Sequence, residues 1–172
     1  MRVYLPATAA DLTVLGAGSS SGEAPAGPFP LELQGRPAHA VTGKLAAQMP
    51  DADQDELEWD AFLAASVEAA LMLGAAPDSA PMRVVLSLDL PDAAVQEPEP
   101  AARAELNLPP SSVLISASRG AKLQAIHVDE PETAPLITAF RTDPGAPGAL
   151  EKLVDADLLW YSPTELSEIP IP

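Results

Sequence analysis

Two pairs of polar side chains in this sequence have the spacing that acid–base chemistry needs. His127 and Asp129 lie two residues apart in a segment with strand-like alternation, so both side chains project from one face of that strand. Arg2 and Tyr4 share a face of the opening strand in the same way. If these strands are neighbours, the four side chains converge into a cluster in which a carboxylate orients the imidazole. Arg2, Tyr4, His127 and Asp129 are therefore the candidate catalytic residues of a small, hydrolase-like enzyme.

The second histidine, His39, allows a metal-site alternative. Together with His127 and Asp129 it would complete a ligand set of two histidines and one carboxylate. The chain has only two histidines, and neither lies in a metal-ligand motif. We therefore expect no metal and interpret His127 as a half-buried strand residue.

The effect of replacing His127 by alanine depends on whether the residue is functional or structural. If His127 is functional, the change abolishes ligand binding or turnover and leaves the melting temperature nearly unchanged. If it is structural, the change costs on the order of 1–3 kcal/mol, because a buried partner loses its hydrogen bond. We favour the structural outcome, with His127 on an internal strand and a carboxylate within its reach.

A glycine- and serine-rich segment resembles two known motifs. The glycines Gly16, Gly18 and Gly22 follow a short apolar run, as in a dinucleotide-binding loop, and the segment 18–22 fits a nucleophile elbow with Ser20 as nucleophile. Both motifs require a helix directly after the loop, but three prolines follow instead, at positions 25, 28 and 30. We expect an ordinary connection over 16–30 and no cofactor.

Composition excludes several classes of function. The formal net charge is −16, from nine Lys and Arg against 25 Asp and Glu, and it repels the phosphates of nucleic acids. No cysteine is present to form a disulfide or a thiolate metal site. The sequence shows no secretory signal and no run of ~20 apolar residues that would span a membrane. We expect a soluble cytoplasmic protein that contacts neither nucleic acid nor membranes.

Periodicity places the secondary structure. Alternating apolar residues predict strands at 1–5, 38–41, 82–90, 113–118, 122–128 and 158–161, together with a shorter extended stretch at 31–33. Arg119-Gly120 between two of these strands predicts a hairpin that joins them. The Pro- and Glu-rich segment 91–111 is interpreted as a surface excursion with at most a short strand near 104–108.

The clearest helix runs from about Asp53 to Leu73. Asp53 and Glu56 have the spacing of a capping box, and apolar residues then recur on one face that we expect to be buried. That face carries Trp59, Phe62, Leu63, Val67, Ala70 and Leu71. The acidic residues of 51–60 are interpreted as a solvated helix start, although they could also attract a basic partner. Trp160 and Tyr161 near the chain's end belong to the core or to an interface.

These elements predict a single α+β domain over 1–172. We expect a mainly antiparallel sheet of about five strands with helices largely on one face, because a strand buried on both sides would read as a continuous apolar run. The alternative is a three-layer α/β sandwich with a mixed sheet. Short helices are expected at 8–15, 42–49, 132–141 and 148–154, and a capping box at Ser162–Glu165 opens a final turn.

Several short segments, in the same order along most of the chain, resemble one family of short acidic conserved hypothetical proteins of high-GC bacteria, whose function is unknown. The segments are Met1–Thr8, Ala40–Thr42, the acidic block before Trp59, Arg83–Val85, Ala125–Asp129 and Leu159–Tyr161. The resemblance implies a cytoplasmic single domain and assigns no catalytic residue.

Two functions remain open at this point. The absence of a spacing-constrained catalytic motif, the negative charge and the long surface loops favour a non-enzymatic binding or regulatory module with a protein or small-molecule partner. The alternative is the small enzyme built around His127 and Asp129.

Overall fold

The computed structural model describes residues 1–18, 29–76 and 78–172. The strands are β1 (Arg2–Ala7), β2 (Pro37–Ala40), β3 (Val84–Asp89), β4 (Val95–Gln96), β5 (Ser112–Ile115), β6 (Lys122–Asp129) and β7 (Leu158–Tyr161). The α-helices are α1 (Ala9–Gly18), α2 (Gly43–Gln48), α3 (Gln54–Ala75), α4 (Pro100–Glu105), α5 (Ala134–Thr142) and α6 (Ala149–Val154). Short 3-10 turns are η1 (Asp92–Ala94), η2 (Pro131–Thr133) and η3 (Pro163–Glu168).

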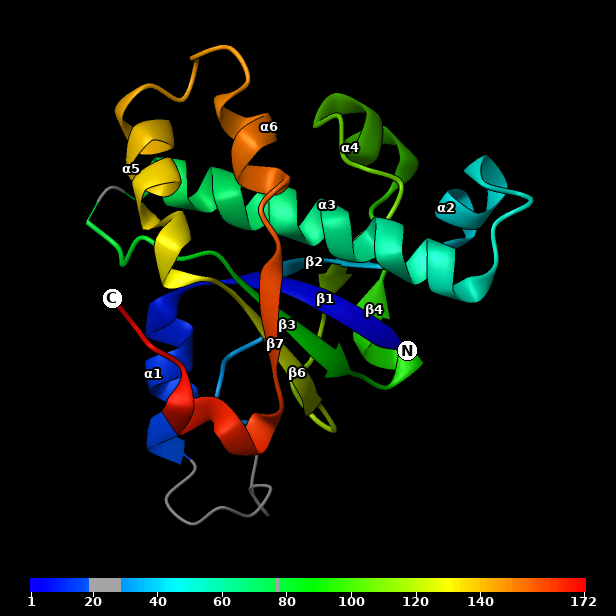
Figure 1. Ribbon diagram of the computed structural model, residues 1–172. Helices are drawn as coiled ribbons and strands as arrows, with labels where there is room; N and C mark the ends of the chain where they lie inside the picture. Colours follow the sequence, from blue (N-terminus) through cyan, green and yellow to red (C-terminus); the bar gives the residue numbers. More distant parts are fainter. Residues whose placement is uncertain (19–28, 77) are drawn as a thin grey trace.

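One antiparallel sheet of seven strands, rather than about five, organises the chain in the order β4-β5-β2-β1-β3-β6-β7. All six strand pairs of the described residues are antiparallel, which supports the α+β prediction against a mixed three-layer sheet. The N-terminal strand β1 lies at the centre, between β2 and β3 (Figure 1).

The predicted hairpin between 113–118 and 122–128 is wrong. β5 pairs with β2 and β4, whereas β6 pairs with β3 and β7 on the other side of β1. Gly120, with φ +81°, does form a tight turn, but the chain uses it to pass from one half of the sheet to the other. Alternation predicts that a segment is a strand, but it carries no information about which strand it joins.

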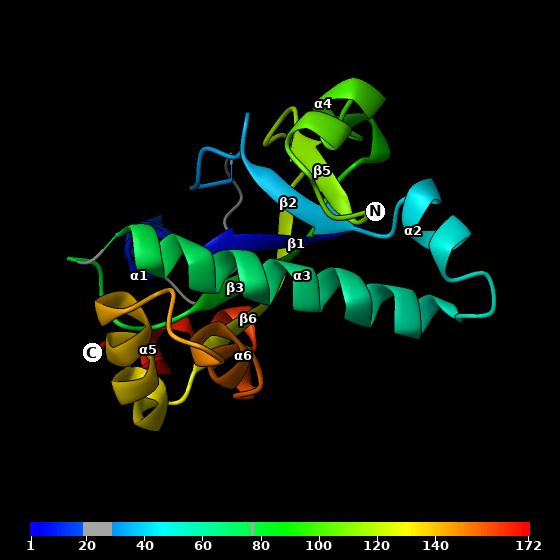
Figure 2. The same cartoon turned by 90° about the horizontal axis from the view of Figure 1, so that it is seen from above.

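Both faces of the sheet are buried, which corrects the expectation of one solvated face. On β3, Val84, Leu86 and Leu88 belong to one core, while Val85 and Ser87 lie on the other face. α1 and η3 cover the first face and α3 crosses the second, where α5 and α6 pack beside it (Figures 1 and 2). Of the polar residues that alternate along β3, Ser87 is thus buried with a hydrogen-bond partner, whereas Asp89 at the end of the strand is partly exposed and is bonded to Arg2.

The long helix α3 is confirmed, but of the predicted buried stripe only Ala70 is fully buried, and Phe62 is partly buried against the core. Asp53 and Glu56 form the predicted capping box. The residues that face the sheet are small: the row Leu57, Ala61, Ala65 and Ala69 is buried. Trp59 and Leu71, in contrast, are more than half exposed. Alanine allows the helix axis to lie close to the sheet, and the large apolar residues are displaced to its flank.

None of the helices in the described parts of the chain, α3 included, is long and apolar enough to cross a membrane. The glycine-rich segment is only partly described: Gly16 and Gly18 lie inside α1 and not in a loop, so α1 continues past the predicted end at Leu15. Ser20 and Gly22 lie outside the described residues. The stretch 31–33 is buried at its leucines but forms no strand.

The segment 91–111 is organised around Arg103. No strand forms near 104–108; instead the segment contains η1, β4 and α4. The buried Arg103 guanidinium donates hydrogen bonds to the backbone carbonyls of Pro109, Pro110 and Ser112. A cation that satisfies three carbonyls fixes this irregular backbone against the edge of the sheet.

A buried ion pair joins Arg83, the residue directly before β3, to Asp129 at the end of β6, next to α3. Arg83 is 0% exposed and Asp129 2%. The Arg83 Nε and Nη2 atoms donate to the Asp129 carboxylate at 3.0 and 2.7 Å, and the Arg83 backbone N–H donates to it at 2.6 Å. The remaining guanidinium donors reach Ser66 on α3 at 3.0 Å and the Ala156 carbonyl ahead of β7 at 2.8 Å. All polar atoms of the pair are therefore engaged.

Replacement of Arg83 by methionine is expected to lower the free energy of unfolding by about 3–5 kcal/mol, because it leaves the Asp129 carboxylate buried without its partner. The double variant Arg83→Met/Asp129→Leu should regain most of this loss, since no buried charge remains. Urea denaturation followed by circular dichroism measures both. The exposed Arg119, changed to methionine, is the matched control, with an expected change within about 0.5 kcal/mol. An Arg83→Met variant as stable as the wild type would contradict the prediction.

Candidate functional site

The four candidate catalytic residues share the face of the sheet that α3 crosses, but they do not converge. Arg2 and Tyr4 lie on β1, and His127 and Asp129 on β6. β3 separates these two strands, so the condition for direct convergence is not met. Each candidate instead contacts a side chain from β3 or α3.

Asp129 does not orient His127. Both of its carboxylate oxygens accept hydrogen bonds from Arg83, and burial leaves no room for another role. The sequence analysis missed Arg83 because a single arginine at an alternating strand position is usually solvent-exposed. The predicted acid–base pair of His127 and Asp129 is therefore wrong, and with it the cluster on which the enzyme hypothesis depended.

His127 is half-buried on β6 and bonds to a serine, and within the described part of the chain it makes no hydrogen bond to a carboxylate. Its Nε2 lies 3.0 Å from the Ser87 Oγ, and its ring lies 4.7 Å, centroid to centroid, from the ring of Phe62 on α3. Burial lowers the pKa of His127 from 6.5 to about 4, so the imidazole is neutral at pH 7. The adjacent Ser87 is only 2% exposed, and a substrate cannot reach its hydroxyl. This serine–histidine contact is a structural hydrogen bond and no nucleophilic pair.

Arg2 and Tyr4 are held by acidic partners. The Tyr4 hydroxyl donates to Glu58 on α3 at 3.1 Å, and burial, helped by Glu58, raises the pKa of Tyr4 to about 12. The Arg2 Nε donates to Asp89 on β3 at 2.8 Å, and this bond is the main reason why the pKa of Arg2 is raised. The phenol stays protonated at neutral pH. The guanidinium also stays protonated, with its charge balanced by Asp89, so neither group is suited to proton transfer.

His39 lies on β2, three strands away from His127, and the two cannot share a metal ion. Its Nδ1 is 2.9 Å from the Ser111 Oγ, and its Nε2 is 2.7 Å from a Glu68 carboxylate oxygen on α3. The set resembles a serine–histidine–acid triad, but Ser111 is 0% exposed and closed to substrate. Over the described residues, no group of three or more His, Asp or Glu side chains has metal-site geometry.

The face also carries aromatic side chains that the sequence analysis had placed mainly in the core. Trp59 is 59% exposed and Trp160 61%. Trp59 stacks on Phe62 at 5.4 Å, and Phe62 contacts His127 at 4.7 Å. Trp160 on β7 is directly opposite His127 on β6, so the two side chains project from the same face. We call these four residues, Trp59, Phe62, His127 and Trp160, the aromatic patch.

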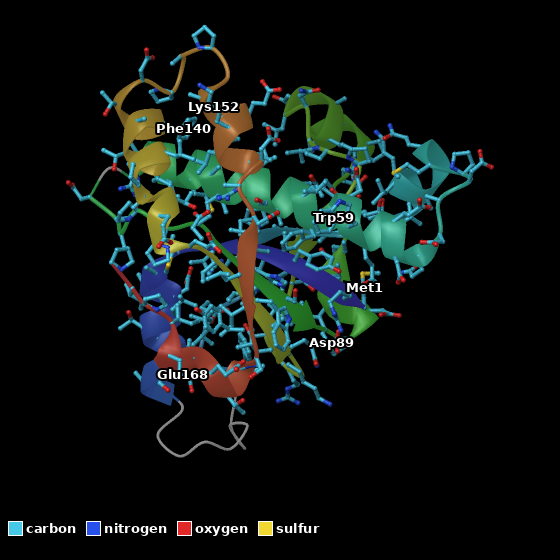
Figure 3. The ribbon with its side chains drawn as sticks, in the orientation of Figure 1. Met1, Trp59, Asp89, Phe140, Lys152 and Glu168 are labelled. Atoms are coloured by element: carbon cyan, nitrogen blue, oxygen red, sulfur yellow. The ribbon has the colours of Figure 1, made fainter. Side chains whose placement is uncertain are left out.

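The aromatic patch lies where β6 and β7 meet the flank of α3, at a part of this face that stays partly exposed. Figure 3 shows Trp59 on this side of α3, above the end of the sheet where Met1 and Asp89 are labelled. Exposed tryptophans are unusual on a soluble surface because each leaves a large apolar area in water. The row of alanines in α3 is the sequence feature that could have indicated this exposure. If the alanines face the sheet, large residues on the other faces of the helix lie further from it.

The chain matches, over residues 1–169, the family described as "Family of unknown function (DUF6912)", and it belongs to that family. No curated protein and no solved structure is significantly similar to it. The resemblance to a family of unknown function is thereby confirmed over nearly the whole chain, and no residue receives a role from the comparison.

The free energy of unfolding is expected to fall as the pH drops from about 6.5 to about 4, and His127 contributes to this fall. Between these values the unfolded chain binds a proton at position 127 that the folded chain does not bind. The contribution is on the order of 3 kcal/mol as an upper bound. His127→Asn keeps a polar group for Ser87 and removes the titration, so urea denaturation across this pH range should show a weaker pH dependence. Identical pH dependence in the two proteins would contradict the prediction.

Proposed function

We propose that this protein is a non-enzymatic binding module and that the aromatic patch is its binding surface. The observation that carries the proposal is the position of the chain's two tryptophans. Both are more than half exposed, and they lie on one face, next to Phe62 and His127. Tryptophan contributes more binding energy per residue than most side chains, because a partner that covers its ring removes a large apolar area from water.

The support comes also from the rigidity beneath the patch. Phe62 contacts Tyr4 edge-on at 5.8 Å, and Tyr4 is bonded to Glu58 one turn earlier on α3. His127 is fixed by Ser87. A surface whose side chains are already held in place loses little conformational entropy when a partner binds. A cytoplasmic location stays a prediction from the sequence.

The alternative of a small hydrolase is weakened by the same contacts. Asp129 is occupied by Arg83, and Ser87 is buried beneath His127. We expect hydrolysis of p-nitrophenyl acetate to be no faster with the wild-type protein than with the His127→Ala variant. A rate that falls both with His127→Ala and with Ser87→Ala, in variants that keep the wild-type circular dichroism spectrum, would favour the enzyme instead.

The double variant Trp59→Ala/Trp160→Ala is expected to lose the proteins that the immobilised wild type retains from a lysate of the source cell. Its stability should change by little, since both side chains are largely exposed. Mass spectrometry of the retained proteins measures the loss, and urea denaturation checks the fold.

The matched control is Leu106→Ala, which removes a comparably exposed apolar side chain at the end of α4. It should retain the same proteins as the wild type. If the double variant retains that set unchanged, or if the wild type retains nothing at any salt concentration, the aromatic patch is not a binding surface for a protein.

A further inference from the structure

We infer that the occupant of the aromatic patch is a basic, extended peptide segment of a partner protein that pairs with the free edge of β7. The inference rests on the proposed function and adds to it the chemistry and the conformation of the partner. Three features of the described residues carry it: the unprotected edge of the sheet, the exposed indole rings, and the surplus of carboxylates around them.

Within residues 1–18, 29–76 and 78–172, β7 is the last strand of the sheet and pairs only with β6. Its four residues, Leu158 to Tyr161, carry no charge, and none is fully buried. In the portions of the chain that the structure covers, no backbone hydrogen bond outside the sheet ladder involves these residues. Edge strands are usually blunted by their shortness, a lysine, a proline or a bulge, because their free N–H and C=O groups recruit other strands. β7 is short, at four residues, but it carries no lysine, proline or bulge, and such an apolar edge fits the addition of an extended peptide.

The side chains of an added strand would alternate between the two faces of the sheet. Those on the α3 face would lie next to Trp160, which is directly opposite His127 on β6. Phe62 and Trp59 continue this surface from β6 toward the flank of α3. A long side chain of the added strand that projects from this face first meets the indole ring of Trp160.

The carboxylates around the aromatic patch favour a positively charged peptide side chain next to Trp160. Asp55 and Glu56 lie one helical turn before Trp59 on the same flank of α3, and Asp155 and Asp157 precede β7; all four are exposed. Among the cations on this face, Arg83 is buried in its pair with Asp129, Arg2 is bonded to Asp89, and Lys122 lies directly across from Asp89. Indole faces attract lysine and arginine, and the formal net charge of −16 favours the approach of basic segments. Lysine or arginine at alternating positions of the peptide would satisfy both features.

Intrinsic fluorescence tests the inference directly, because the only two tryptophans of the chain are the ones that the peptide would cover. The probe is a short peptide that alternates Lys with Val, titrated into the wild type and into the single-tryptophan variants Trp59→Phe and Trp160→Phe. We expect the emission to change on binding. Trp160→Ala should weaken binding roughly 2- to 30-fold, the range that a cation–π contact gives between exposed and desolvated sites.

Matched probes and variants separate the parts of the inference. Asp55→Asn/Asp157→Asn should weaken binding and reduce its salt dependence, whereas Glu130→Gln/Glu132→Gln, with exposed carboxylates on and just before η2, should not. The same peptide with alternate backbone nitrogens methylated should bind more weakly, because it cannot pair with β7. Spermidine, a cation without a peptide backbone, should bind more weakly still.

Each result that differs from these expectations overturns one part of the inference. Equal binding of a Glu/Val peptide would overturn the cation and leave the aromatic patch as a binding surface. Equal binding of the methylated peptide or of spermidine would overturn strand addition. No change in emission with any of these probes would overturn the inference as a whole, while the loss of lysate proteins from the double tryptophan variant would still decide the proposed function.

Discussion

The buried pair of Arg83 and Asp129 is the interaction on which the arrangement of this face depends. One guanidinium binds the end of β6, the middle of α3 through Ser66, and the segment ahead of β7 through the Ala156 carbonyl. These contacts fix the position of α3 over the sheet and the course of the chain into the edge strand. They also remove Asp129 from chemistry, since a carboxylate that neutralises a buried cation cannot at the same time orient a histidine. The same contact thus stabilises the fold and argues against the enzyme that the sequence allowed.

Along α3, polar contacts and small side chains work together. Glu58 bonds to Tyr4, Ser66 to Arg83 and Glu68 to His39, so the helix reaches β1, β3 and β2 in turn. Between these contacts lie the alanines that face the sheet. Short side chains bring the helix close enough for these three polar groups to meet residues of the sheet directly. Within the described residues, no buried side-chain nitrogen or oxygen lacks a hydrogen-bond partner. The buried polar groups of this face are therefore all paired, by α3 or within the sheet, while Trp59 and Leu71 of α3 are more than half exposed.

Local signals in the sequence predict local structure well here. The capping boxes at Asp53 and Ser162, the strand at β3 and the short strand β7 follow from spacing and alternation that involve only near neighbours. What fails is non-local. The partner of β6 is β3 and not β5, and Arg83 satisfies Asp129 across 46 residues. The apolar periodicity of α3 predicts a buried Trp59, because tryptophan is more apolar than alanine. In the structure the helix packs close to the sheet, and only the smaller alanine side chains fit between them. Nor does anything in the sequence distinguish a histidine that bonds Ser87 from one that binds a substrate.

The central place of β1 has a consequence for how the chain folds. β1 is made of residues 2–7, yet one of its two neighbours begins at residue 84, and the half-sheet beyond that neighbour ends with residues 158–161. Long loops must close, at a cost in chain entropy, before contacts between such distant segments stabilise the fold. This requirement slows folding to roughly milliseconds to seconds. During synthesis on the ribosome, β1 emerges before the other strands of this sheet and can pair early only with β2, whereas its other edge stays uncovered until β3, at residues 84–89, has been made. Until then an apolar strand edge is exposed to chaperones and to misassembly.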